Sequence, residues 1–308
     1  MTEKNDIKKF AITGVAGYIA SRHLQAIKDT GNNLVAACDP HDSVGILDKY
    51  FQDVSFFTEF ERFDRHLEKL RRGANENTID YLTICSPNNL HDAHIRLALR
   101  LGADAICEKP LVLNPWNLDQ LQELENETGK RIYTILQLRT HPSIIELKNK
   151  TNSAEPNKKY NVNLSYITSR GPWYHYSWKG NEAKSGGIGT NIGIHFFDML
   201  IWLFGKVESY NVSMRKPDKM KGTIELENAN VNWLLSIDQN DLPQSAKNVG
   251  QPTYRSITID GEEIEFSGGF ADLHTIVYKE ILEGNGFTIE DARPAIQLAH
   301  DIRTAVVK

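Results

Sequence analysis

The chain has 308 residues, of which 40% are hydrophobic and 24% are charged. This length predicts about two domains and a core large enough to fold without disulfides or a structural metal. The formal net charge of −5 disfavours a nucleic-acid-binding surface, and the longest apolar stretch, 196–204, is far too short to span a membrane.

The N-terminal segment Met1–Asp6 is polar and lacks the apolar region of a signal peptide. The chain has three cysteines, Cys38, Cys85 and Cys107, and each ends an apolar, strand-like run. An odd number in such positions is typical of free, buried thiols in a reducing compartment, so we expect a cytoplasmic protein. Their spacing does not match a metal site, and we expect none.

In the first part of the chain, short apolar runs alternate with segments of helical periodicity. The pattern predicts strands over 8–13, 33–38, 79–85, 103–107 and 131–136. It predicts helices over 19–30, 59–72, 89–101 and from about residue 115. Such alternation is typical of a parallel sheet with helices on both faces, so we expect a doubly wound α/β domain over 1–139.

The pattern changes after about residue 140. We expect strands over 160–169, 207–215, 223–226, 230–238, 256–259 and 263–266, and then helices over 270–283 and 290–306. Turn residues between strands, such as Asp260-Gly261, favour antiparallel pairing, so residues 140–308 are predicted to form an α+β domain with a mostly antiparallel, open-faced sheet. We interpret the polar segment 151–158 as a linker-like loop. Because an open face would expose apolar side chains in a monomer, we expect a homodimer or homotetramer.

A glycine-rich turn follows the first predicted strand. Gly14 and Gly17 would let the backbone approach a pyrophosphate, and the next helix would supply N–H donors. The spacing G-x-x-G-x-x-A is one residue longer than the usual dinucleotide fingerprint, and a simple strand–helix turn is the alternative. Asp39, about 20 residues further on, is placed to bind ribose hydroxyls and to favour NAD over NADP. The alternative for Asp39 is a helix N-cap or a turn residue before Pro40.

Two motifs follow later strands of the same domain, at the carboxyl ends where ligands bind in such sheets. They are Ser86-Pro87-Asn88-Asn89-Leu90-His91 and Glu108-Lys109-Pro110. The proline restricts the backbone of the residue before it, so Lys109 is held in place. A lysine in a cleft can hold and polarise a substrate hydroxyl.

These motifs, followed by Gly186-Gly187 and Gly193-x-His195-x-x-Asp198, resemble the Gfo/Idh/MocA oxidoreductases in order and spacing along nearly the whole chain. The resemblance implies a Rossmann domain that binds a nicotinamide cofactor, a second domain often used for oligomerisation, and a substrate held between them. It also implies that Lys109 and His195 carry the chemistry. The family often has Asp four residues before this histidine. Here Asn191 cannot act as a base, but it can orient a hydroxyl or an acetamido group.

Segments 136–142, 170–180 and 184–195 resemble one bacterial subgroup more narrowly, the UDP-N-acetylglucosaminuronic acid 3-dehydrogenases of the WlbA/WbpB type. This resemblance implies NAD-dependent oxidation of the 3″-hydroxyl of that UDP-sugar, in the biosynthesis of diacetamido-uronic acids for lipopolysaccharide. One alternative is another sugar or inositol dehydrogenase of the family. Another is a non-catalytic NAD-sensing regulator, against which the presence of both Lys109 and His195 argues.

In this interpretation His195 takes the proton from the sugar hydroxyl, Lys109 holds the same oxygen, and NAD accepts the hydride. The alternative for His195 is a helix histidine satisfied by Asp198. The expected cofactor contacts are Gly14, Ala16, Gly17, Tyr18, Ile19, Asp39, Ser86, Asn88, His91, Glu108, Gln137 and Trp178. The expected substrate contacts are Lys109, Arg139, Arg170, Tyr174, Lys179, Asn191 and His195.

Four cations near the motifs are candidates to hold the diphosphate and the carboxylate of the sugar nucleotide. They are Arg139, Arg170, Lys179 and Lys184. Solvated surface charge is the alternative for each of them. The aromatic residues of the same region can stack on uracil or nicotinamide, or pack at a domain interface. They are Trp173, Tyr174, Tyr176 and Trp178.

Overall fold

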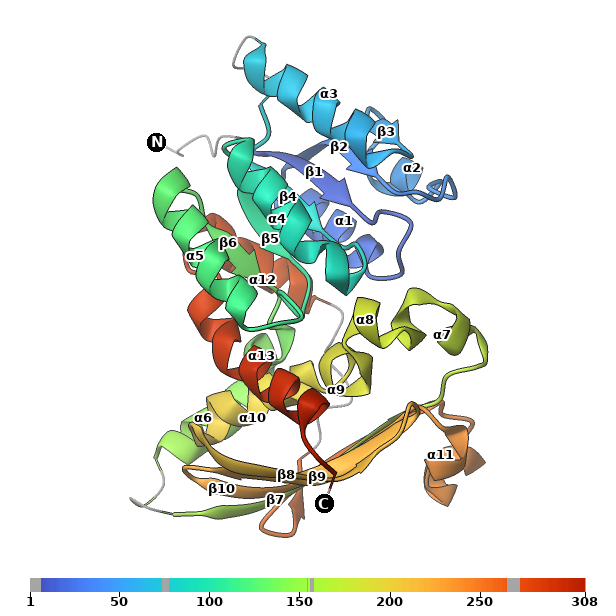
Figure 1. Cartoon of the computed structure of the whole chain (residues 1–308), viewed down its shortest axis with the longest axis vertical. Coiled ribbons are helices and arrows are strands. Elements are labelled where there is room, and N and C mark those ends of the chain that lie inside the picture. The colour runs from blue at the N-terminus through green and yellow to red at the C-terminus, as the bar shows by residue number, and fades with distance from the viewer. Residues whose placement is uncertain (1–6, 74–77, 154, 156–157, 265–271, 308) are drawn as a thin grey trace. The chain divides into compact units, whose positions relative to one another are not determined.

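The structure is a computed structural model that describes residues 7–73, 78–153, 155, 158–264 and 272–307. The chain divides into two compact units. The first unit comprises residues 1–112, 116–135 and 271–291, and the second comprises residues 113–115, 136–270 and 292–308. Each unit contains one six-stranded sheet (Figure 1).

The sheet of the first unit is parallel throughout, with strand order β3-β2-β1-β4-β5-β6. The strands are β1 (Lys9–Thr13), β2 (Asn33–Cys38), β3 (Ser55–Phe57), β4 (Tyr81–Ile84), β5 (Asp104–Cys107) and β6 (Ile132–Thr134). The chain winds outward from β1 to β3 and then returns to β4 beside β1, where Thr13 pairs with Ile84. The order therefore reverses between β1 and β4, and ligands bind at such a switch point in doubly wound sheets.

Helices cover both faces of this sheet (Figure 1). They are α1 (Ala20–Asp29), α2 (Leu47–Tyr50), α3 (Phe60–Arg72), α4 (His91–Arg100), α5 (Trp116–Thr128) and α12 (Leu273–Leu282), with the short 3₁₀ helix η2 (Asn88–Leu90). On one face, Phe10 and Ile12 of β1 pack against Leu24 of α1 and Tyr278 of α12. The core of the first unit therefore includes a helix that lies far along the chain.

The sheet of the second unit has the order β12-β11-β7-β10-β9-β8. The strands are β7 (Tyr160–Thr168), β8 (Val207–Arg215), β9 (Lys219–Leu226), β10 (Ala229–Ser236), β11 (Thr253–Ile259) and β12 (Glu262–Glu263). All neighbours are antiparallel except β7 and β10. At the β11–β12 turn, Asp260 and Gly261 adopt positive φ angles of 51° and 89°, as a tight hairpin turn requires.

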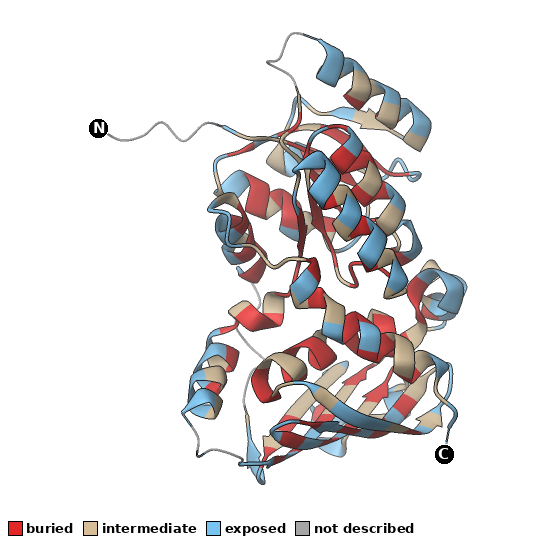
Figure 2. Ribbon diagram, turned by 60° about the vertical axis from the view of Figure 1, so that its left-hand side comes forward, coloured by how far each residue is buried: buried red, intermediate tan, exposed pale blue. Residues whose placement is uncertain are grey.

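The remaining helices cover one face of this second sheet or lie at its ends (Figure 1). They are η3 (Gln137–Thr140), α6 (Pro142–Asn152), α7 (Trp173–Tyr176), η4 (Trp178–Gly180), α8 (Glu182–Ser185), α9 (Gly187–Asn191), α10 (Ile194–Phe204), η5 (Gln239–Asp241), α11 (Gln244–Asn248) and α13 (Ile289–Thr304). Helix α10 is apolar and mostly buried (Figure 2). Its Phe197 meets Trp233 of β10 edge to face, with ring centroids 5.6 Å apart. A Cβ at Gly193 would lie 2.8 Å from a methyl carbon of Leu235, so glycine permits this close approach of α10 to the sheet.

The middle of the open face of the second sheet is polar, and the apolar residues Ile167, Leu234 and Tyr254 at one end of it pack against Leu242 and Ala246, so the expectation of an exposed apolar face is wrong. One row across five strands consists of Asn211, Thr223, Asn232, Asn163 and Thr258. Asn232 donates to Asn163 over 3.1 Å, and Asn163 donates to Thr258 over 3.3 Å. Strand alternation explains the error, because neighbours such as Val162 and Trp233 point to the helix-covered face and are buried.

The predicted α/β architecture is confirmed, with a parallel sheet followed by a mostly antiparallel one. Most predicted elements agree with the observed ones to within about three residues. The strand β3, the helices α2 and α6 to α11, and the parallel β7–β10 pair were not predicted. Residues 1–6, three residues of segment 151–158, and parts of the predicted elements 263–266 and 270–283 lie outside the described residues. Among the described residues no single helix is long and apolar enough to cross a membrane, and only the bent pair 182–191 with 194–204 passes by length and composition.

Candidate active site

The turn after β1 requires glycine at its first position. Gly14 has φ +77°, and its N–H donates to the carbonyl of Cys38 over 2.8 Å. A Cβ at this position would clash with the carbonyl of Cys85 and would lie 2.6 Å from the nitrogen of Ser86. The turn therefore lies directly against the end of β4. Gly17 closes it with a 3.0 Å hydrogen bond to the carbonyl of Gly14.

Helix α1 begins after this turn in a way that suits an anion. Ile19 is its N-cap residue, so no side chain caps the helix, and its first turn contains no acidic residue. The positive end of the helix dipole therefore lies at the glycine turn without a competing carboxylate in the helix, where it favours a phosphate. Tyr18, just before the helix, is 85% exposed.

Asp39 is buried at the end of β2 and faces the turn. Its Oδ2 accepts from the N–H of Ala16 over 3.0 Å, and its Oδ1 accepts from the N–H of His41 over 2.9 Å. The second bond is the local turn that was the alternative interpretation. The first ties the carboxylate to the glycine turn, at the place where a ribose would lie in a Rossmann site.

The loop after β4 is held by buried histidines. His91 lies with Nε2 2.9 Å from the carbonyl of Ser86 and Nδ1 2.8 Å from the carbonyl of Pro110, and burial lowers its pKa. His94 lies 2.9 Å from Oγ of Ser86 and its pKa is lowered by burial to about 4. Asn88, at the start of η2, is also buried. Thus His91 joins the two loops that carry the predicted site motifs.

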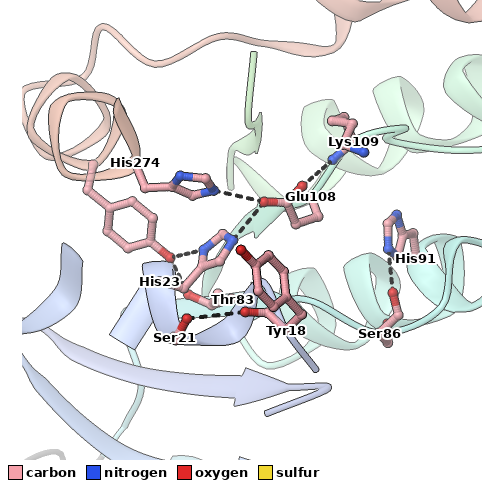
Figure 3. Close-up of polar contacts among 10 residues, drawn as sticks. Tyr18, Ser21, His23, Thr83, Ser86, His91, Glu108, Lys109 and His274 are labelled. Atoms are coloured by element: carbon pink, nitrogen blue, oxygen red, sulfur yellow. Dashed lines mark hydrogen bonds and ion pairs between the residues drawn. The ribbon is translucent and has the colours of Figure 1, made fainter. Parts of the chain in front are cut away.

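Glu108 and Lys109 follow β5 (Figure 3), and only the first is buried. The Oε1 atom of Glu108 lies 2.9 Å from Nε2 of His23 and 3.1 Å from Nε2 of His274. Its Oε2 accepts from the backbone N–H of Lys109 over 3.2 Å. Burial alone would raise the pKa of Glu108, but the hydrogen bonds from the two histidines hold it well below its ordinary value. Lys109 is half-buried.

The second unit contains a buried ion pair behind the Gly-x-His motif. Arg139 of η3 donates from Nε and Nη2 to the two carboxylate oxygens of Asp198, over 3.1 Å and 2.7 Å. Both side chains are nearly inaccessible to solvent. Asp198 lies on α10, one turn after His195, which is half-buried. The ion pair therefore fixes the orientation of Arg139. Gln137, in the same short helix, is half-buried.

Short helices and glycine turns place Asn191 near Tyr174. Gly186 and Gly187 have φ angles of +78° and +71°, which reverse the chain between α8 and α9. The amide of Asn191, at the end of α9, donates to the hydroxyl of Tyr174 over 3.2 Å. Tyr174 is buried, and burial raises its pKa.

The aromatic-rich segment forms a partly exposed cation–aromatic cluster. The ammonium of Lys179 lies 5.7 Å from the ring centroid of Trp173 and 5.6 Å from that of Trp178. Burial, and then the charge of Arg170, lower the pKa of Lys179. Trp173 is half exposed and Tyr176 is 90% exposed. Two further predicted cations, Arg170 and Lys184, are exposed.

No sequence pattern predicts a functional role for His23, His274 or Tyr278. Each lies on an otherwise ordinary helical pattern, and no motif marks it. The i, i+4 spacing of His274 and Tyr278 puts them on one face of α12, but it gives no partner. The prediction of buried, free cysteines is confirmed for Cys38, Cys85 and Cys107, and burial raises the pKa of all three thiols.

Two family models match the chain. Residues 8–136 match the oxidoreductase family with an NAD-binding Rossmann fold, GFO_IDH_MocA, and residues 158–240 match its C-terminal alpha/beta domain. Among curated proteins, oxidoreductase cns1 of Cordyceps militaris is 31% identical over 40% of this chain, which spans only 15% of that protein. D-glucoside 3-dehydrogenase of Escherichia coli is 25% identical over 67% of this chain, which spans 66% of that enzyme.

A solved structure is much more similar. The WlbA (WbpB) dehydrogenase from Thermus thermophilus, in complex with NAD and UDP-GlcNAcA, is 51% identical, with a TM-score of 0.94. The match covers 98% of this chain and 96% of that one. Another structure of the same dehydrogenase contains NAD and alpha-ketoglutarate.

Proposed function

Because the chain belongs to the Gfo/Idh/MocA oxidoreductase family, we propose that it is an NAD-dependent sugar-nucleotide dehydrogenase acting on UDP-N-acetylglucosaminuronic acid. The observation that carries this proposal is the 51% identity, along 98% of the chain, to a dehydrogenase whose structure contains NAD and this sugar nucleotide. The reaction converts the 3″-hydroxyl to a ketone. Its product enters the biosynthesis of diacetamido-uronic acids for lipopolysaccharide.

NAD is the cofactor, and the first unit fits it. The uncapped start of α1 suits the pyrophosphate, and Gly14 lets the backbone approach it. The buried carboxylate of Asp39 suits ribose hydroxyls and repels a 2′-phosphate. When bound, NAD+ supplies the hydride acceptor for the C3–H bond.

Two residues carry the remaining chemistry in this proposal. His195 takes the proton of the 3″-hydroxyl as the C3–H bond breaks, and Lys109 holds the same oxygen and stabilises its developing negative charge. The reaction needs neutral His195, so kcat should fall about tenfold per pH unit on the acidic side of a histidine titration, within roughly pH 5–8. A rate that stays flat from pH 5 to pH 9 would exclude His195 as the base.

The other expected substrate contacts lie in the second unit. Lys179 and Arg170 are proposed to bind the anionic groups of the sugar nucleotide, with Trp173 or Trp178 available for stacking on uracil. Arg139 is proposed to reach the substrate from a direction set by Asp198.

Reduced cofactor must be oxidised before the next cycle. We propose that a 2-oxo acid serves as the second substrate, because the Thermus thermophilus relative was crystallised with NAD and alpha-ketoglutarate. Mixing the NADH-loaded enzyme with alpha-ketoglutarate should remove the NADH absorbance. No loss of absorbance would instead favour release of NADH into solution.

We also propose a cytoplasmic homodimer or homotetramer. Free cysteines support a reducing compartment. The uncharged row of Asn and Thr side chains on the second sheet suits the centre of a subunit interface, where charged residues are depleted. Light scattering on the purified protein distinguishes these states from a monomer.

The experiment that tests the function is NADH absorbance after mixing purified enzyme, NAD+ and UDP-N-acetylglucosaminuronic acid. The enzyme and the substrate are used at equal concentrations, so that a single turnover gives a visible change in absorbance. UDP-glucuronate, UDP-N-acetylglucosamine and inositol run in parallel. We expect a signal with the first sugar nucleotide alone. A signal with inositol alone would assign a different substrate within the family. If no compound produces NADH absorbance although NAD binding is intact, a regulatory protein is favoured.

A further inference from the structure

A chain of buried polar side chains lies behind Lys109, entirely within the first unit (Figure 3). It runs from Thr83 of β4 to Tyr278 of α12 over 2.9 Å, and from Tyr278 to Nδ1 of His23 on α1 over 2.8 Å. His23 continues to Glu108, which His274 of α12 also contacts. One strand, β4, and two helices, α1 and α12, which are distant in sequence, thus converge on the residue before Lys109.

The hydrogen bonds are consistent with one arrangement of protons. An ionised Glu108 can only accept, so Nε2 of both His23 and His274 must donate to Oε1. Nδ1 of His23 then accepts from the hydroxyl of Tyr278, which in turn accepts from Thr83. Burial lowers the pKa of His23 despite its hydrogen bond to Glu108, which favours the neutral imidazole.

The network is costly to bury, which indicates that it has a role. His23 is fully inaccessible, and Glu108 and His274 are nearly so. An apolar core would be easier to bury at this position, since a buried carboxylate requires several donors. Nδ1 of His274 has no hydrogen-bond partner among the described residues. Burying this ring beside Glu108 therefore carries a further cost in desolvation free energy.

The same three side chains, His23, Glu108 and His274, have the ligand types of a small metal site. Both imidazole nitrogens, however, already lie at hydrogen-bond distance from the same carboxylate oxygen. The hydrogen bonds therefore account for all three ligand atoms without an ion.

We propose that His23 and His274 are positioning residues for Lys109, acting through Glu108. The two imidazoles hold Oε1, and this directs Oε2 to the backbone N–H of Lys109, which fixes the peptide from which the lysine side chain extends. Tyr278 fixes His23 from the other side. The inference rests on the proposed function, in which Lys109 holds the reacting oxygen.

The test compares three variants in the full-length protein. His274→Leu removes the donor to Glu108, whereas His274→Gln keeps an N–H near the same place. Ile281→Ala, on the same helix, removes buried packing but no hydrogen bond. We expect His274→Leu to lower kcat roughly 30-fold with both KM values changed less than about threefold, because a small displacement of a reacting group costs up to about 100-fold. His274→Gln should recover most of the loss, and Ile281→Ala should lower the melting temperature with kcat nearly unchanged.

The proposal is overturned if kcat of folded His274→Leu stays within about twofold of the wild type, or if Ile281→Ala loses as much as His274→Leu. It is also overturned if the purified protein holds a stoichiometric metal that His274→Leu releases. If His274→Leu does not fold, Tyr278→Phe removes only a hydroxyl. For that variant we expect kcat to fall about threefold, and no change would count against the network.

A second measurement separates this inference from the proposed function. The rate at which trinitrobenzenesulfonate labels Lys109, followed by peptide mass spectrometry, requires no substrate. We expect this rate to change at least threefold in His274→Leu, while Lys69 on the exposed side of α3 is labelled as before. Absence of sugar oxidation by the wild type would refute the substrate proposal alone. Unchanged Lys109 labelling would refute the positioning role alone.

Discussion

The two residues proposed to perform the chemistry are supported in different ways. Lys109 depends on buried partners from α1 and α12, which lie some 80 to 170 positions away in sequence. His195 lies at the start of a buried helix that follows glycine turns, and a neighbouring segment supplies the Tyr174–Asn191 contact. The first residue is held by hydrogen bonds of the adjacent Glu108 to residues 85 and 166 positions away, and the second by glycine turns, helix packing and an ion pair between residues 59 positions apart.

This difference determines which substitutions each residue tolerates. A change far along the chain, in α12, can reach Lys109 through hydrogen bonds. Changes that affect His195 should instead cluster near it, in the glycine turns and in the Arg139–Asp198 ion pair.

The largest effect is expected for Lys109→Ala. Without the ammonium, the reacting oxygen loses its stabilising charge, and kcat should fall about 1,000-fold. NAD binding, measured by fluorescence titration, should change less than about threefold. Full loss of NAD binding would mean that Lys109 serves the cofactor and not the reacting oxygen.

Arg139→Ala tests the support of the second unit. It leaves the carboxylate of Asp198 buried without its main partner, so the free energy of unfolding should fall by about 3–5 kcal/mol. Chemical denaturation measures this loss. Arg71→Ala, which breaks an exposed ion pair with Glu68 in the first unit, is the control and should change little. Equal effects of the two substitutions would contradict the importance of burial.

Gly14→Ala tests the backbone that underlies the first unit's site. The added Cβ meets the backbone of Cys85 and requires a strained positive φ, so we expect a loss of about 2–3 kcal/mol in stability and weaker NAD binding. Gly31→Ala is the control, since it has a similar φ but no atom within 4 Å of the added Cβ. NAD binding that is intact in Gly14→Ala would mean that the turn does not need this close approach.

The smallest effect is the loss of stability that we expect when the pH is lowered. The pKa values of His23 and His94 are lowered in the folded state, so the unfolded chain binds more protons below about pH 6.5. The stability that depends on these neutral histidines is present above that pH and is lost as the pH falls toward 4. Hydrogen exchange of first-unit core peptides, corrected for intrinsic rates, should therefore be faster at pH 5 than at pH 7. Equal protection at both values would contradict the lowered pKa values.

Much of the fold follows from local patterns. The strand periodicity and the turn at Asp260-Gly261 predict the second sheet well, because alternation and turn chemistry are local properties. The parallel pairing of β7 with β10 is not predictable in this way, since strand order depends on contacts distant in sequence. The polar row around Asn232 follows from the same alternation, because Asn230 and Asn232 lie on the face opposite Val231 and Trp233.

The candidate site divides in the same manner. Gly14 and Asp39 were identifiable because a motif and a spacing mark them, and the structure brings the Asp39 carboxylate to the glycine turn. The burial of Arg139 against Asp198 was not predictable, because each residue has a plausible surface role alone. The histidines behind Glu108 carry no local signal at all. Only the folded first unit joins His23 to His274.

Helix α12 has a consequence for how this enzyme can be rearranged. Residues 271–291 belong to the first unit, although some 135 residues of the second unit separate them from β6. A chimera that exchanged the cofactor-binding part at a single cut near residue 139 would leave behind Tyr278, His274 and part of the core. Any recombination that preserves the dehydrogenase must therefore move two separate stretches of gene together. To exchange substrate specificity, the segment that forms most of the second unit must be inserted between two parts of the first unit, because joining the two units end to end would lose α12.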